Sequence, residues 1–153
     1  MELRKIEVCT ETLGITQHAL KALRDTLADR IDHNLVVCRV VADDGHAYGL
    51  FVLDYTVGVA VVVGDGFRQD GGGEGGAGHR AAQALLSIWG IEPIEWDNVC
   101  RYTEEVEEYR DIIVEMWDTY RDLSFTHHRS GNLGYIRNNK PRYIDWVHHE
   151  IRG

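Results

Sequence analysis

The sequence predicts an α+β domain with an antiparallel sheet of about four strands, a helix after the first strand, and C-terminal helices packed on the sheet. Three observations predict it. An alternating segment precedes a helical stripe of leucines, three β-branched segments follow with short links, and amphipathic helical segments come last. The chain has 153 residues, 44% of them hydrophobic and 27% charged, which suits a single domain over residues 1–153.

The expected strands are recognised by alternation and by β-branched residues. They are residues 3–9, 35–41, 47–55 and 57–63. The links between the last three are shorter than the dozen or so residues of a parallel crossover, so these strands should form an antiparallel meander. Residues 91–96 contain Pro93 and are expected to form a loop or an edge strand.

Apolar residues at spacings of three and four indicate the helices. Thr16 is the expected N-cap of the first helix, and Thr103 that of the third. Pro141 is placed like the first residue of a short terminal helix. The expected helices cover residues 16–31, 79–89, 103–120 and 141–151.

Charge and cysteine content restrict the partners and the compartment. The formal net charge of −9 makes long nucleic acid and anionic membrane poor partners. The three scattered cysteines are expected to be buried thiols in a reducing compartment. No apolar stretch approaches the roughly 20 residues of a membrane span, and no signal peptide is recognised. We therefore expect a cytoplasmic protein.

The glycines are concentrated in one stretch, with 8 of the 16 between Gly64 and Gly78. Ordering glycine costs backbone entropy, and a glycine loop between a strand and a helix presents N–H groups to an anion. This pattern predicts a site for a phosphate-bearing small molecule. The candidate ligand-binding residues are Phe67, Arg68, Gly73, Gly75, Gly76, His79 and Arg80. The alternative is a mobile linker, which the neighbouring carboxylates of Asp65, Asp70 and Glu74 favour.

Residues 68–73 read Arg-Gln-Asp-Gly-Gly-Gly, after a strand and before a helix. They resemble the pyrophosphate loop of acyl-CoA-dependent N-acetyltransferases. That loop begins with Arg or Gln, has Gly at the fourth position, and has Gly or Ala at the sixth. In that family the helix starts at once, whereas here Glu74 to Gly78 are expected to intervene. The resemblance implies an enzyme that binds acetyl-CoA.

The opening strand LRKI, a basic helix with Lys21 and Arg24, and residues 73–78 resemble a second family. This is the phage anti-Thoeris nucleotide sponge family, with an N-terminal sheet, a glycine-rich loop and C-terminal helices. The resemblance implies a non-catalytic homo-oligomer that sequesters a cyclic nucleotide or cyclic ADP-ribose-type signal in the host cytoplasm. The glycine loop would face ligand at a subunit interface, and Lys21 and Arg24 would line a second anion site. Otherwise these two side chains are solvated surface.

Motifs for catalysis and metal binding are not recognised. The histidine pairs at 127–128 and 148–149 lack metal-ligand spacing, and there is no GxSxG segment. We therefore expect no catalytic residue, no metal and no cofactor, and prefer a nucleotide-sequestering protein over the acetyltransferase. A third interpretation is an interaction protein whose glycine loop is a hinge.

Overall fold

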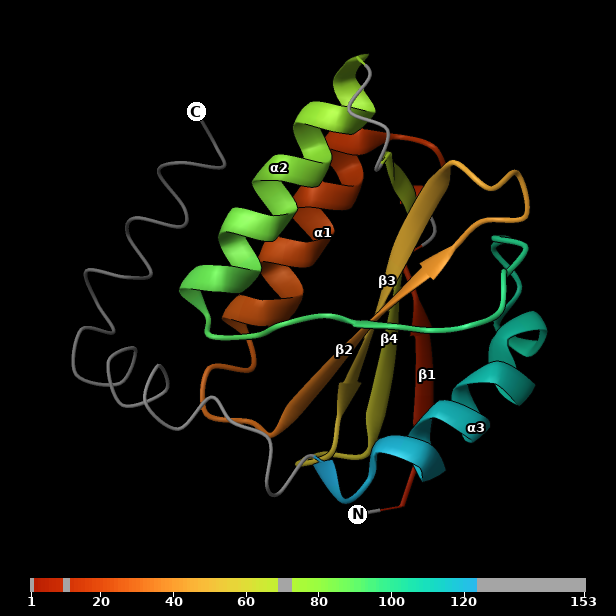
Figure 1. Ribbon diagram of the computed structural model, residues 1–153. Helices are drawn as coiled ribbons and strands as arrows, with labels where there is room; N and C mark the ends of the chain where they lie inside the picture. The colour runs from red at the N-terminus through yellow and green to blue at the C-terminus, as the bar shows by residue number, and fades with distance from the viewer. Residues whose placement is uncertain (1, 10–11, 69–72, 124–153) are drawn as a thin grey trace.

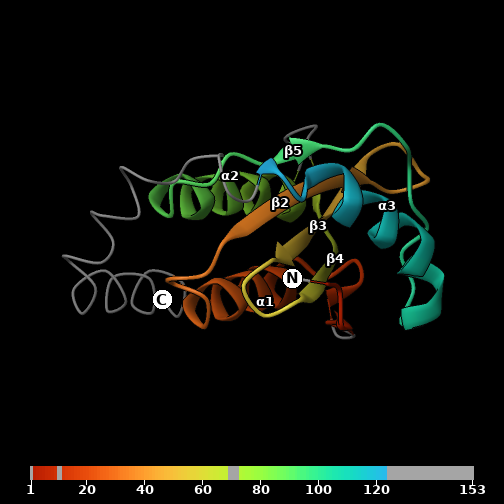
Figure 2. The same cartoon turned by 90° about the horizontal axis from the view of Figure 1, so that it is seen from below.

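The computed structural model describes residues 2–9, 12–68 and 73–123. Within them, a five-stranded mixed sheet lies between two helical layers, with α1 and α2 on one face and α3 on the other (Figures 1 and 2). The strands are β1 (Lys5–Val8), β2 (Leu35–Val41), β3 (Ala47–Asp54), β4 (Val59–Arg68) and β5 (Ile94–Glu95). The helices are α1 (Thr16–Ala28), α2 (Gly73–Ile88), the 3₁₀ turn η2 (Val106–Tyr109) and α3 (Arg110–Tyr120).

The sheet has the strand order β1-β4-β3-β2-β5. The antiparallel meander of β2, β3 and β4 is confirmed. Of the two alternatives for residues 91–96, a loop or an edge strand, the structure shows a two-residue edge strand, β5. The expectation of about four antiparallel strands is wrong in detail, because β1 pairs parallel with β4 and β5 pairs parallel with β2. Both edge strands are joined to the meander through a helix, and a helical crossover allows parallel pairing.

Each face of the sheet carries its own hydrophobic core. In β2, Leu35 and Val37 pack toward α1 and α2, while Val36 and Val40 pack toward α3. Trp89 is fully buried in the first core, and Met116 and Trp117 lie in the second. Strands buried on both faces are expected to be apolar almost throughout, which explains the continuous run in β2.

Two predicted helix caps are wrong. The N-cap of α1 is Ile15, and Thr16 is the first helical residue. The Thr16 hydroxyl donates to the Gly66 carbonyl of β4, at 2.5 Å, and so joins α1 to the sheet instead of capping the helix. Thr103 does not cap α3, which begins at Arg110 after the η2 turn. The Thr103 hydroxyl accepts a hydrogen bond from the Glu105 N–H in a local turn. The terminal helix expected after Pro141 lies outside the described residues.

Tyrosine hydroxyls attach the segment 102–120 to the sheet. The Tyr55 hydroxyl donates to the Trp117 carbonyl at 2.8 Å, and the two rings stack with centroids 4.0 Å apart. Tyr102 lies against Gly49, at a bulge between β3 and β4. Its hydroxyl accepts the Gly49 N–H and donates to the Val40 carbonyl. Phe51 of the sheet meets both Tyr102 and Tyr109 edge-on.

Burial of tyrosine phenols and of a cysteine thiol makes the unfolding free energy depend on pH in the alkaline range. It raises the pKa of Tyr48 and Tyr109 from 10.0 to about 12, and that of Cys38 from 9.0 to about 12. The folded chain therefore keeps protons that the unfolded chain has lost. We expect the unfolding free energy to be steady below about pH 9 and to fall between about pH 9 and 12, measured by urea titration at each pH. A constant value across that window would contradict this.

Candidate functional site

The glycine-rich stretch is divided between two elements rather than forming one loop. Gly64 and Gly66 belong to β4, and the helix α2 begins at Gly73, six residues before the expected start at His79. Gly75, Gly76 and Gly78 are therefore helical, and residues 69–72 between the two elements lie outside the described part of the chain. The predicted loop over 73–78 is wrong, because tertiary packing outweighs the low helix propensity of glycine here.

Close packing accounts for three of these glycines. A Cβ at Gly66 would meet Ala19 and Ile15 of the α1 start, and a Cβ at Gly78 would collide with the Thr16 methyl group. A Cβ at Gly75 would collide with the side chain of Arg68. The absent side chains thus allow α1, α2 and the end of β4 to approach one another.

The corner where β4 and α2 meet contains a hollow of about 400 Å³. The structure brings the predicted residues Arg68 and Gly75 together in its lining. Three carboxylates, those of Asp44, Asp65 and Glu74, line the same hollow. Negative charge therefore exceeds positive charge there, which opposes the binding of phosphate.

Phe67 and His79 take part in a packed cluster around Tyr48. Phe67 is fully buried with its ring centroid 5.4 Å from that of Tyr48, so its ring is covered rather than presented to a base. His79 Nδ1 is hydrogen-bonded to the Tyr48 hydroxyl. Burial, followed by the charges of Arg39 and Arg80, lowers the pKa of His79.

Arg39 is a residue that sequence reasoning missed. Its guanidinium lies 5.3 Å from the Tyr48 ring centroid and forms an ion pair with Glu95 of β5. Arg39 is the single charged residue of β2, which is otherwise apolar. A charge in such a strand is the sequence feature that could have marked it as a candidate. Arg80 is exposed on α2.

Lys21 and Arg24 of α1 lie in different environments, since one side chain is exposed and the other is buried. Arg24 is 7% exposed and its guanidinium pairs with Asp25 at 2.7 Å. Lys21 is exposed and lines a hollow of about 420 Å³ between α1 and the end of β1. Arg24 is not in that lining, so the structure does not bring the two cations to one cavity.

A larger cavity, of about 510 Å³, lies between β1 and α3. We call it the β1–α3 cavity. Its apolar lining consists of Leu3, Ile6, Val106, Val114 and Trp117. Its charged lining consists of Arg4, Lys5, Arg110 and Arg121 with Glu2 and Asp118. Basic side chains therefore outnumber acidic ones here, in a chain whose net charge is −9.

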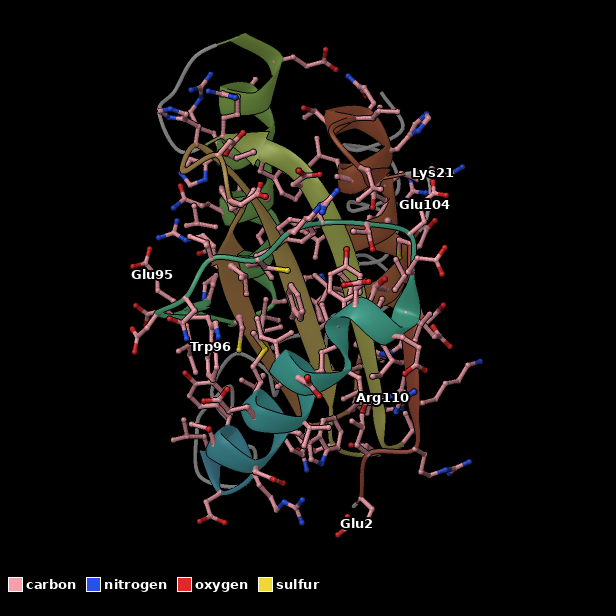
Figure 3. The ribbon with its side chains drawn as sticks, turned by 90° about the vertical axis from the view of Figure 1, so that its right-hand side faces the viewer. Glu2, Lys21, Glu95, Trp96, Glu104 and Arg110 are labelled. Carbon is pink, nitrogen blue, oxygen red and sulfur yellow. The ribbon has the colours of Figure 1, made fainter. Side chains whose placement is uncertain are left out.

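The basic groups of this cavity differ in their partners. Arg121 bridges Glu2 at 3.3 Å and Asp118 at 3.1 Å, and these contacts raise its pKa. Arg110 grips the Glu107 carboxylate with two hydrogen bonds of 2.9 and 2.8 Å. Figure 3 shows Arg110 on α3 beside β1, with Glu2 at the foot of that strand. Among the described residues, no carboxylate lies within ion-pair distance of Arg4.

The sequence carried a signal for this cavity. Val106, Arg110, Val114 and Asp118 recur every four residues, so they lie along one side of the η2–α3 segment. A charge-rich helix is ordinarily a solvated face, and the sequence does not place β1 opposite it. Only the parallel pairing of β1 with β4 brings Arg4 and Lys5 to this helix.

Comparisons with known proteins give no significant match to a protein-family model, a curated protein or a solved structure. The two family resemblances therefore stay predictions. None of the helices in the described ranges is long and apolar enough to cross a membrane. Within the same ranges, His, Cys, Asp and Glu side chains form no group of three that is suited to a metal ion.

The packing role of Gly78 can be tested by substitution. Gly78→Ala should lower the unfolding free energy by about 1–2 kcal/mol, because overpacking outweighs the better helix propensity of alanine. In a Thr16→Ser background, which removes the colliding methyl group, Gly78→Ala should instead be neutral or stabilising by up to about 1 kcal/mol. Urea unfolding of the four proteins measures both effects. An equal loss in both backgrounds would contradict the assigned contact.

Proposed function

We propose that this protein binds a phosphate-bearing small molecule in the β1–α3 cavity and holds it without chemical conversion. The observation that supports this is a lining in which four basic side chains outnumber two acidic ones and stand beside five apolar ones. A volume of about 510 Å³ lies within the range of small-molecule sites. The anion site predicted from the glycines thus moves to the opposite face of the sheet.

A nucleotide matches both halves of the lining. Guanidinium groups of Arg4 and Arg110 suit phosphate oxygens, which they can contact with two parallel hydrogen bonds. The apolar side chains of Val106 and Val114 offer a surface to a base. The ion pairs of Arg110 and Arg121 are solvent-exposed, and such pairs contribute only about 0–1 kcal/mol each, so a phosphate can compete with their carboxylates.

The chemistry of these groups supports binding rather than catalysis. Arginine stays protonated at neutral pH, and its contacts raise the pKa of Arg110 and of Arg121 further. These side chains therefore supply fixed positive charge and orientation rather than proton transfer. This supports a sponge that sequesters a cyclic nucleotide or cyclic ADP-ribose-type signal and so counters host immune signalling.

Arg4→Ala and Arg110→Ala test the site directly. With a panel of cyclic nucleotides and cyclic ADP-ribose, the wild-type protein should gain thermal stability. Each substitution should weaken binding about tenfold or more in calorimetry, because a charge-assisted hydrogen bond contributes roughly 1.5–3 kcal/mol. Arg80→Ala removes an exposed arginine on α2 and is the matched control, with unchanged affinity. Binding that depends on Arg80 alone, or no binding across the panel, would overturn the proposal.

An acyl-CoA-dependent acetyltransferase is the second candidate, and one observation favours it. The helix α2 begins at Gly73, the last residue of the segment that resembles the pyrophosphate loop, so the expected gap after that loop is absent. The carboxylates around Arg68 count against it. The cavity proposal is preferred because its lining has the charge that a phosphate needs.

Acetyl-CoA separates these two candidates. If the acetyltransferase interpretation is right, acetyl-CoA raises the melting temperature, Arg68→Ala abolishes the shift, and free thiol is released with an amine acceptor. On the cavity proposal, no thiol is released, and Arg68→Ala leaves nucleotide binding unchanged. Thiol release by the wild-type protein that Arg68→Ala abolishes would reverse our preference.

A further inference from the structure

The strand β1 has an open edge. The carbonyl of Gly58, directly before β4, accepts the backbone N–H groups of Arg4 at 2.7 Å and Lys5 at 3.2 Å, and the Val62 carbonyl of β4 accepts that of Cys9. In a parallel pair, alternate residues bond to the same neighbour, so the N–H and C=O groups of Ile6 and Val8 point away from β4. In the described part of the chain, no other strand pairs with this edge.

Hollows lie beside this strand on both faces of the sheet. The β1–α3 cavity borders Leu3 and Ile6 on one face, and the hollow of about 420 Å³ borders Val8 and Cys9 on the other. The helices α3 and α1 therefore leave unfilled space beside β1 on both faces. An exposed edge of this kind is a template for pairing with another strand.

The charges on β1 select a particular partner. Lys5 and Glu7 share one face of the strand and form an ion pair of 3.2 Å, with side chains 65% and 42% exposed. If two copies pair antiparallel about Ile6, Lys5 of each copy lies opposite Glu7 of the other. Opposite charges directly across a strand pair are stabilising, and like charges are destabilising.

The same charges exclude the neighbouring registers. Side chains that are opposite each other across a strand pair lie on the same face of the sheet. A shift of β1 against its copy must therefore keep Lys5 and Glu7 of both copies on that face. A slip one way centres the pair on Lys5 and brings two lysines together. A slip the other way centres it on Glu7 and brings two glutamates together. Only the register about Ile6 is complementary.

We propose that a second copy of this chain occupies the edge, by antiparallel β1–β1 pairing about a two-fold axis at Ile6. The dimer then has one continuous sheet with five strands from each copy. Such an interface is self-complementary, as two-fold symmetry requires. The proposal stands on the edge and its charges, and it does not depend on ligand binding. It places the two β1–α3 cavities beside the interface.

Charge reversal tests the interface. The wild-type protein should be a dimer by native mass spectrometry and by light scattering after size exclusion. Glu7→Lys brings two pairs of lysines together and should weaken dimerisation at least tenfold. The double variant Lys5→Glu with Glu7→Lys restores opposite charges across the pair and should recover the dimer. Glu92→Lys makes the same charge change on an exposed residue next to β5, at the opposite edge, and should leave the dimer intact.

Circular dichroism of each variant establishes that the exposed substitutions leave the fold unchanged. A wild-type monomer at micromolar concentration overturns the proposal. So does an assembly that Glu7→Lys leaves intact, or one that the double variant fails to restore. Neither Glu7 nor Glu92 lines the β1–α3 cavity, whereas Lys5 does. All variants are therefore compared without ligand, so that failure of this test is distinguished from failure of the ligand test with Arg4 and Arg110.

Discussion

Burial of the β2-β3-β4 meander on both faces is the constraint on which the rest of the structure depends. Every residue of β3 is buried, so neither face of this strand can be left in water. The chain meets this requirement with α1 and α2 on one side and α3 on the other. The edge strands follow from it, because each is joined to the meander by one of the helices that cover the same face.

The glycine-rich stretch illustrates how a sequence pattern can have a packing cause. Gly66 and Gly78 lie where the end of β4, the start of α1 and the start of α2 meet. Thr16 joins the same contact through its hydroxyl and its methyl group. The glycines therefore bring two helices and a strand together, whereas the arginines that line a cavity are gathered on the other face of the sheet.

Local patterns predicted the meander and the approximate positions of three helices, and they left the segment around Pro93 open between a loop and an edge strand. They did not predict the parallel edges, since strand neighbours depend on contacts far apart in the sequence. The start of α2 was missed because glycine favours loops locally, and only packing against Thr16 shows why it is helical. The β1–α3 cavity was not predicted because it also depends on contacts far apart in the sequence. Arg4 and Arg110 line one cavity only because β1 pairs beside the α3 segment.

The tyrosine attachment of the segment 102–120 has a thermodynamic consequence for the β1–α3 cavity. This segment is joined to the sheet by one layer of side chains and by the hydroxyls of Tyr55 and Tyr102. The same side chains cover one face of the meander, so the α3 layer cannot leave the sheet without exposing apolar surface. One wall of the cavity belongs to this layer, so the cavity exists only while the layer is packed on the sheet. By linkage, a ligand that bound there would therefore stabilise the packed layer and the meander beneath it together.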